Sequence, residues 1–331
     1  IALDRGDRKL LALLARAGRP VLLCERSASL GGRAATRERD GFHLNLGPHA
    51  LYLGGPGAGV LAELGIQPRG GAPRTSGYAL YRGRLFTLPV GFVSLLTTGL
   101  FSAAEKIEAG RLLARLPSID ARSLDGVALS DWLGRTVQHP QVRRLLLALG
   151  RLATYVHAPD RQSAGAVIAQ LQLALGPGVL YLDGGWQQLV DALRDRATAL
   201  GAHIEVGRAV ERVVQEGGVR GVRFSDGRVQ PASAVVLAVG LAAAARLIEG
   251  QTSVHAAAEA VLPARAACLD VALSELPRPR ALFALGIDQP LYLSVHSASA
   301  RLAPPGAALI HVAKYLAPDV PPGDDDRQEL E

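Results

Sequence analysis

The start of the chain combines an apolar helix, a short apolar strand and an acidic residue at the strand's end. Lys9 to Ala17 has helical apolar spacing, Val21 to Cys24 is an unbroken apolar run typical of a buried strand, and Glu25 follows directly. Dinucleotide-binding βαβ units place an acid at this point, because a carboxylate there accepts both ribose hydroxyls. The sequence therefore predicts an α/β fold with a nucleotide-binding unit near the start of the chain.

A glycine-rich stretch after Glu25 extends this prediction. Gly31 and Gly32 let the backbone approach a ligand closely, and Arg33 offers a planar donor fork suited to phosphate. Phe42 to Leu46 alternates as a strand and leads into the turn Gly47-Pro48-His49. Each piece alone is compatible with an ordinary loop, and only their combination and order indicate a nucleotide-binding site.

Taken in this order, the residues resemble the flavin amine oxidase superfamily, specifically its phytoene desaturase-like and protoporphyrinogen oxidase-like branch. The family pattern is an acid, a short spacer, Gly-Gly-Arg, and an aromatic-led strand that ends in Gly-Pro. Two later stretches are also similar to the family. Tyr181 to Val213 matches a Gly-Gly helix with the strand beyond it, and Ala232 to Gly240 matches a strand that returns to the flavin domain.

The resemblance implies FAD as the cofactor and a set of residues that bind it. Glu25 would bind the adenosine ribose, Arg33 would lie along the diphosphate in the same crevice, and Val210 would bond the adenine edge through its backbone. The backbone of Gly47 to His49 would border the isoalloxazine ring. The full implied set is Glu25, Arg26, Gly31, Gly32, Arg33, Gly47, Pro48, His49 and Val210. The sequence identifies no catalytic residue, and its eight histidines and two cysteines lack metal-ligand spacing.

The element pattern predicts α/β class (α+β overall). A discontinuous Rossmann-like FAD/NAD(P)-binding domain is expected over residues 1–75 and 176–250, and an inserted substrate domain of helices and antiparallel strands over 76–175 and 251–320. Residues 92–173 have helical spacing, while 78–81 and 85–88 form a hairpin. We expect the helical block and the strands near 281–287 and 291–296 to form the wall of an apolar substrate chamber.

Two departures from the family pattern bear on cofactor binding. Aligned back from Glu25, the fingerprint glycines should fall near Ala2, Asp4 and Asp7, where carboxylates would repel a diphosphate. The sequence also stops before the family's C-terminal flavin segment. We therefore expect a chain that lacks its natural ends and binds FAD poorly.

The composition and the distribution of charge indicate which kinds of partner the chain can bind. The formal charge is +6, but the basic residues are dispersed and few aromatics interleave with them, which argues against nucleic-acid binding. Cys24 and Cys268 are interpreted as buried free thiols in a reducing compartment. Leu85 to Ala104 carries no charge and is interpreted as a buried loop and helix, or as an apolar surface that touches a membrane or admits the substrate. We expect a cytoplasmic protein, and peripheral contact with a membrane stays open, as does the oligomeric state.

The predicted activity is FAD-dependent oxidation of a mainly apolar small molecule by hydride transfer to the flavin. Isomerase or saturase chemistry on the same flavin scaffold stays open. One alternative is a truncated or degenerate, non-catalytic homologue that holds little or no FAD. Another is an NAD(P)-dependent enzyme, which would need an intact glycine turn.

Overall fold

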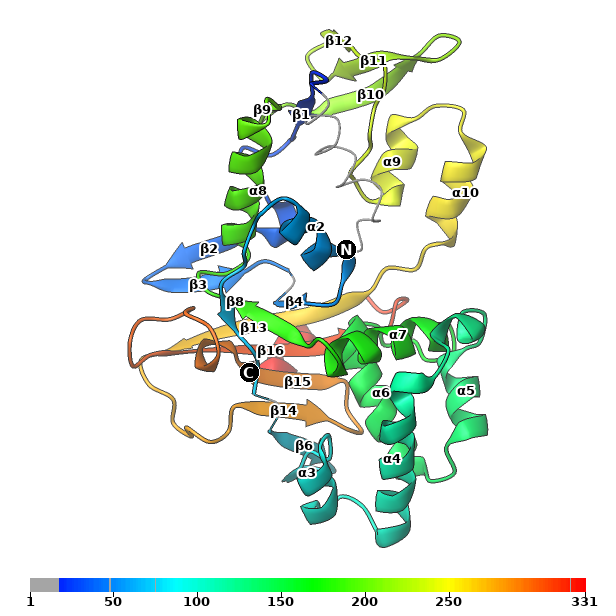
Figure 1. The fold of residues 1–331 in the computed structure, drawn as a ribbon, viewed down its shortest axis with the longest axis vertical. Coiled ribbons are helices and arrows are strands. Elements are labelled where there is room, and N and C mark those ends of the chain that lie inside the picture. The colour runs from blue at the N-terminus through cyan, green and yellow to red at the C-terminus, as the bar shows by residue number, and fades with distance from the viewer. Residues whose placement is uncertain (1–17, 48, 75, 322) are drawn as a thin grey trace.

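The computed structural model describes residues 18–47, 49–74, 76–321 and 323–331. Its elements form two groups (Figure 1). The upper group contains a small two-stranded parallel sheet, and the lower group is built around a six-stranded sheet. The fold is mixed α/β, as predicted. The predicted helix from Lys9 to Ala17, with Asp4, Asp7 and Pro48, lies outside the described residues.

The six-stranded sheet has the order β13-β16-β15-β14-β6-β7. Strands β14 and β6 are parallel, and the other neighbours are antiparallel. Strands β6, β7, β14 and β15 lie where apolar or alternating patterns predicted them. The strands are β6 (Tyr78–Tyr81), β7 (Arg84–Thr87), β13 (Arg265–Leu273), β14 (Phe283–Gly286), β15 (Leu291–Val295) and β16 (Ala308–Leu316).

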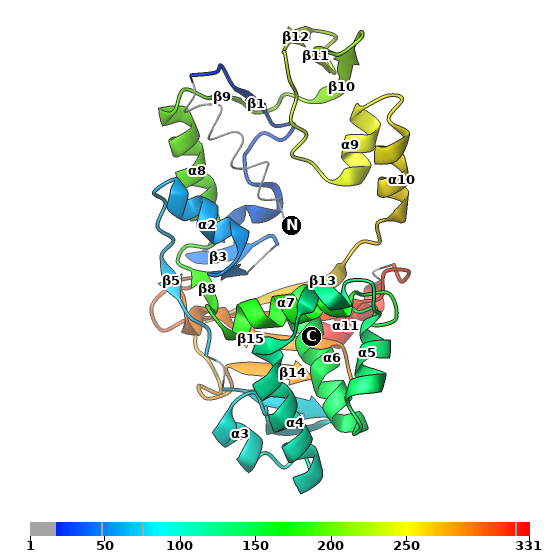
Figure 2. The ribbon, with the colours of Figure 1, turned by 45° about the vertical axis from the view of Figure 1, so that its right-hand side comes forward.

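The helical block predicted over residues 92–173 is confirmed, and its helices gather beside the lower sheet (Figure 2). Local signals fix several of its ends. Ser102 and Glu105 form a capping box at the start of α4, and Pro140 occupies the first turn of α6, where its missing N–H costs nothing. The helices are α3 (Phe92–Thr97), α4 (Ala103–Arg115), α5 (Leu129–Thr136), α6 (Pro140–Thr154) and α7 (Ala164–Leu175).

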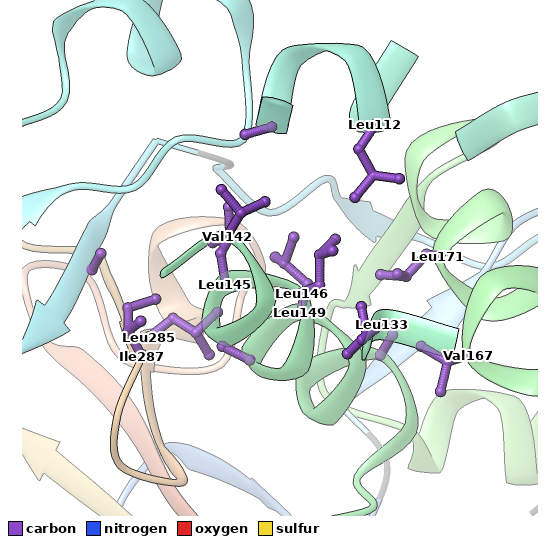
Figure 3. Close-up of a cluster of buried hydrophobic side chains, with 14 of the residues drawn as sticks. Leu112, Leu133, Val142, Leu145, Leu146, Leu149, Val167, Leu171, Leu285 and Ile287 are labelled. Carbon is purple, nitrogen blue, oxygen red and sulfur yellow. The ribbon is translucent and has the colours of Figure 1, made fainter. Parts of the chain in front are cut away.

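Packed side chains fill the contact between α6 and the six-stranded sheet. Leu145, Leu146 and Leu149 project from α6 into one buried cluster that also contains Leu285 and Ile287 of the sheet region (Figure 3). The spacing of these leucines places them on one helix face, which explains why that face is buried. Side chains therefore fill this contact, and the expectation that the helical block and the strands form the wall of an apolar substrate chamber stays a prediction.

The upper group holds the nucleotide-type elements. Strands β1 and β9 pair in parallel, and α8 is the helix that the Gly-Gly motif was predicted to open. The elements are β1 (Leu22–Cys24), α8 (Gln187–Ala199), β9 (His203–Glu205), the antiparallel strands β10 (Val210–Gln215), β11 (Val219–Phe224) and β12 (Val229–Pro231), and helices α9 (Leu241–Leu247) and α10 (Thr252–Ala260). The predicted domain boundaries stay a prediction.

Smaller elements join the two groups. Strands β2 (Thr36–Arg39) and β3 (Phe42–Asn45) form a hairpin, and β4 (Ala50–Tyr52), β8 (Val179–Leu182) and β5 (Gly70–Gly71) form a three-stranded sheet. Helix α2 (Pro56–Glu63) follows β4, and α11 (Asp324–Leu330) lies at the C-terminal end. In α11, Asp326 pairs with Lys314 of β16 at 2.8 Å.

The structure corrects two predictions. The apolar run 233–239 was predicted to be a strand, but residues 234–238 have no regular secondary structure. Among the described residues, no strand lies beside this run to exchange backbone hydrogen bonds with it, and an apolar pattern alone does not supply them. Cys24 and Cys268 are free thiols, but Cys268 is exposed rather than buried, because it lies on β13 at the edge of its sheet.

Candidate functional site

Glu25 lies at the carboxyl end of the parallel pair β1 and β9. Its backbone N–H donates to the carbonyl of Glu205 at 2.9 Å, which extends the ladder by one residue. Its side-chain Oε1 accepts from the N–H of Ser27 at 2.8 Å. The adjacent Arg26 is exposed. In open α/β sheets, this edge is where ligands bind.

The strand that carries Val210 is tied to Glu25. The N–H of Arg208 donates to the carbonyl of Glu25 at 2.9 Å, and the Arg208 guanidinium lies over the Phe224 ring at 4.3 Å. Val210 pairs with Phe224, and the register shifts between Val210 and Arg212. Such a shift interrupts the ladder beside Val210. Glu25, predicted to bind the ribose, and Val210, predicted to bind the adenine, therefore lie on segments that are hydrogen-bonded to each other.

The Gly31-Gly32-Arg33 turn and the Gly47 turn pack against each other. Gly31 and Gly32 have φ values of 112° and 52°, which a residue with a side chain rarely adopts. A Cβ added at Gly47 would stand 2.4 Å from the carbonyl oxygen of Arg33. The N–H of Leu46 donates to the carbonyl of Ala35 at 3.0 Å, which fixes this approach.

The side chain of Arg33 is exposed, and the described residues give it no hydrogen-bond or ion-pair partner. They also form no contact of this kind between Arg33 and Glu25. The expectation that the two side chains meet at one crevice therefore stays a prediction, as do the binding roles of the other predicted residues.

The start of α8 is held by polar side chains of the β2–β3 hairpin. Asn45 Oδ1 accepts from the N–H of Trp186 at 3.0 Å, and Thr36 Oγ1 accepts from the N–H of Gln187 at 3.1 Å. A Cβ at Gly185 would meet Thr36 Oγ1 at 2.4 Å. The Gly-Gly motif thus permits close packing between a helix end and a hairpin.

Three histidine rings meet where the chain leaves the Gly47 turn at His49. His49 lies 3.8 Å from His311 and 4.6 Å from His296 between ring centroids, and His296 stacks on His311 at 5.2 Å. All three are buried, with exposed fractions of 6% for His49, 2% for His296 and 1% for His311. We call these three residues the histidine cluster. It brings the turn between β3 and β4 onto β16 and the 3-10 turn after β15.

Polar partners surround the histidine cluster. Asp270 Oδ1 lies 2.7 Å from His311 Nδ1, and the Tyr292 hydroxyl lies 3.1 Å from His296 Nε2. A second tyrosine, Tyr181, extends this chain, with 3.2 Å between the two hydroxyl oxygens. The nitrogen atoms His49 Nδ1 and His311 Nε2 are buried and have no partner among the described residues.

The surroundings shift the pKa values of the three histidines in different directions. Burial lowers the pKa of His49 and of His296 well below the ordinary value, and the charge on His311 lowers both further. Burial also lowers the pKa of His311, but the hydrogen bond to Asp270, the attraction of the Asp270 carboxylate and the nearby Cys268 thiol outweigh it and raise this pKa to about 9. At neutral pH the cluster thus holds one imidazolium between two neutral rings.

Sequence reasoning singled out His49 but missed Asp270, His296 and His311. The signal for His311 was its place inside the otherwise apolar strand "ALIHVAKYL", where a buried polar side chain needs a partner. Nothing local in the sequence connects it with Asp270 or His49.

Within the part of the chain that the structure describes, no group of three or more His, Cys, Asp or Glu side chains is arranged to hold a metal ion. None of the helices described there is both long and apolar enough to cross a membrane.

Comparisons with known proteins give a consistent result. Residues 12–264 match the family described as flavin containing amine oxidoreductase. A coproporphyrinogen III oxidase of Propionibacterium freudenreichii subsp. freudenreichii is 30% identical over 307 residues, covering 74% of this chain. The chain spans 57% of the length of that relative.

Solved structures show the same fold. An oxidoreductase from Methanosarcina mazei matches with a TM-score of 0.74 and 21% identity, covering 99% of this chain and 80% of that one. Putrescine oxidase bound to putrescine matches with a TM-score of 0.73 and 17% identity, covering 99% and 78%. Because the family match extends over most of the sequence, the chain belongs to the flavin-containing amine oxidoreductase family.

Proposed function

We propose that the chain binds FAD and oxidises a mainly apolar small molecule by hydride transfer to the flavin. The observation that carries this proposal is the family match over residues 12–264. The close approach of the Gly47 turn to the carbonyl of Arg33 supports it, because it joins two segments that the resemblance assigns to one cofactor.

The residues present fit such a cofactor chemically. Glu25 offers a carboxylate acceptor at a strand end, and Arg33 offers an exposed guanidinium to which the described residues give no partner. His49 places a buried, unpartnered Nδ1 next to the Gly47 turn. When bound, FAD supplies the two-electron acceptor for the hydride.

Each of these residues then has a defined task. Glu25 accepts hydrogen bonds from ribose hydroxyls, Arg33 donates to diphosphate oxygens, and the backbone at Val210 meets the adenine edge. Gly31 and Gly32 keep this approach free of side chains.

Relatives suggest which substrates to test first. The curated relative carries the name coproporphyrinogen III oxidase, and one structural neighbour was solved with putrescine. We propose coproporphyrinogen III as the first molecule to offer and putrescine as the second.

Anaerobic bleaching of the visible flavin band tests the proposed function. The purified chain is saturated with FAD and mixed with each candidate, and bleaching by one of them is the expected result. Arg33→Ala should weaken FAD binding, whereas Arg37→Ala, which removes an exposed arginine from the neighbouring β2, should not. If the chain binds FAD to saturation and neither candidate bleaches the flavin band, the oxidase proposal is contradicted for these two substrates. The family match does not favour the alternative of a non-catalytic homologue.

We also propose a lipid surface as a partner. Phe92, Val93 and Leu96 on α3 have exposed fractions of 78%, 70% and 55%, and Ile107 on α4 has 55%. These four residues form what we call the α3 patch. The basic side chain of Lys106 lies beside it, donating to the carbonyl of Leu96 at 2.7 Å, and would favour anionic headgroups.

A further inference from the structure

We propose that His311, held by Asp270, is the receptor for an anionic group, of carboxylate class, on the small molecule that this chain oxidises. This inference rests on the proposed function and names a chemical property of its substrate. It also assigns a role to two residues that the sequence analysis did not single out.

The backbone register fixes the Asp270–His311 pair. Asp270 on β13 and His311 on β16 are direct cross-strand partners, so their side chains project from the same face of the sheet. Asp270 Oδ1 lies 2.7 Å from His311 Nδ1. A carboxylate bonded to one ring nitrogen fixes the orientation of the imidazole and leaves the other nitrogen for a different partner.

That other nitrogen, His311 Nε2, has no partner among the described residues, although the side chain is only 1% exposed. Buried polar atoms in folded proteins are almost always hydrogen-bonded, so an orphaned one calls for a ligand or an ordered water. His49 Nδ1 is a second buried nitrogen without a partner, on a ring 3.8 Å from that of His311. A carboxylate has two acceptor oxygens and can serve two such nitrogen atoms.

The charge of the histidine cluster selects an anion. Asp270 and Cys268 on β13 raise the pKa of His311, whereas His49 and His296 are kept neutral by burial and by the His311 charge. The ring therefore presents a charged N–H donor at a nitrogen that is shielded from water, where hydrogen bonds to an anion are strong.

The same sheet face is open to solvent at its β13 edge. Cys268 is exposed, and it precedes Asp270 by two residues, so both project from one face of β13. The side chain of Asp270 itself is 22% exposed. Tyr292 and Tyr181, 4% and 7% exposed, pack against His296 on the buried part of the cluster, with ring centroids 6.4 Å and 4.5 Å from that of His296.

Benzoate and benzyl alcohol form a matched pair of probes, since both are aromatic and of similar size but only benzoate is charged. The full chain, without flavin, is labelled with ¹⁵N-histidine and titrated with each probe at pH 7, with affinities measured by calorimetry. We expect benzoate to shift the His311 Nε2 resonance in a saturable manner and to bind at least tenfold more tightly than benzyl alcohol.

Substitutions test whether the preference for benzoate depends on the Asp270–His311 pair. His311→Gln should abolish the preference for benzoate, and Asp270→Asn should reduce it about tenfold, because it removes the carboxylate that keeps the ring charged. The matched control, His255→Gln, changes an exposed histidine on α10 and should leave the preference intact. The unsubstituted chain gives a test that needs no variant: its preference for benzoate should fall above pH 9, where the imidazolium loses its proton.

Equal binding of the two probes, or a preference for benzoate that survives in His311→Gln, would overturn the inference and leave the Asp270–His311 pair a structural one. Flavin plays no part in these measurements. A preference that depends on His311 in a chain that bleaches no flavin would leave the carboxylate-binding site standing and refute the proposed oxidation, and the reverse pattern would do the opposite.

Discussion

At the scale of single residues, the partly buried Asp270–His311 ion pair makes stability depend on pH. His311 has its pKa raised to about 9 from an ordinary value of 6.5, with burial opposing and the bond to Asp270 favouring the charged ring. The raised folded-state pKa means that this contribution is fully present below pH 6.5 and is lost as pH rises through 9. The difference corresponds to roughly 3 kcal/mol as an upper value.

We expect the unfolding free energy of the chain, measured by urea melts, to fall by up to ~3 kcal/mol between pH 6.5 and pH 9.5 relative to that of His311→Gln. Parallel curves for the two proteins across this range would contradict the assigned charge. On the acidic side the sign reverses. His49 and His296 have lowered pKa values, so they oppose folding as pH falls below 6.5.

Gly47 offers a second test at this scale. Gly47→Ala brings a Cβ to 2.4 Å from the backbone carbonyl of Arg33, an atom that cannot rotate away as a side chain would. We expect a loss of ~1–3 kcal/mol in unfolding free energy and weaker FAD binding. Gly59→Ala is the matched control, because its Cβ would meet nothing within 4 Å inside helix α2, and it should gain up to ~1 kcal/mol. Equal effects of the two substitutions would show that the Arg33 contact is unimportant.

At the scale of elements, sequence patterns predicted those structures whose partners are local. The hairpin of β6 and β7 and the neighbouring strands β14 and β15 were predicted because apolar alternation and turn residues specify them directly. The run 233–239 has an equally apolar pattern, but a strand needs a neighbour, which the pattern cannot reveal.

The same limit applies to the candidate site. Glu25, the Gly31–Arg33 turn and the Gly47 turn were found because they are close in sequence and ordered as in a known family. The histidine cluster was not, because His49, His296 and His311 meet through sheet register and the packing of one group of elements on another. Register is decided by the whole sheet, so a single strand's sequence does not contain it.

The α3 patch gives a prediction at this scale. Replacing Phe92 and Leu96 together by serine removes two large apolar side chains that are 78% and 55% exposed, and so should cost little stability. We expect the double variant to sediment less with vesicles of phosphatidylglycerol than the unsubstituted chain does. The control variant, Leu241→Ser, changes a leucine on α9 that is 44% exposed and lies outside the patch. Equal sedimentation of the unsubstituted chain and Phe92→Ser/Leu96→Ser would argue against a lipid partner.

At the scale of the whole molecule, the affinity for FAD depends on all the segments predicted to contact the cofactor. Asp4 and Asp7 lie outside the described residues, and the sequence assigns them to positions where the family has glycine. Each carboxylate near a diphosphate costs on the order of 1–4 kcal/mol. We therefore expect Asp4→Gly/Asp7→Gly to bind FAD at least ~10-fold more tightly than the unsubstituted chain, as measured by quenching of flavin fluorescence.

Asp4→Ala/Asp7→Ala separates the two causes, since it removes the charges without giving the backbone freedom of glycine. An intermediate affinity is the expected result for this variant. Submicromolar binding by the unsubstituted chain would show that the altered turn does not impair the site.

The placement of β6 and β7 next to β14 has a consequence for how the protein is made. The N–H of Arg82, in the hairpin between β6 and β7, donates to Asp288, which lies 206 positions later in the sequence. At ribosomal speeds of about 5–20 residues per second, the hairpin emerges roughly 10–40 s before its parallel neighbour exists. During that interval one edge of β6 carries unpaired N–H and C=O groups that any other extended chain could use. The sheet that holds the histidine cluster therefore closes late in synthesis, and a ribosome that stalls between the two segments would release a chain with an open strand edge.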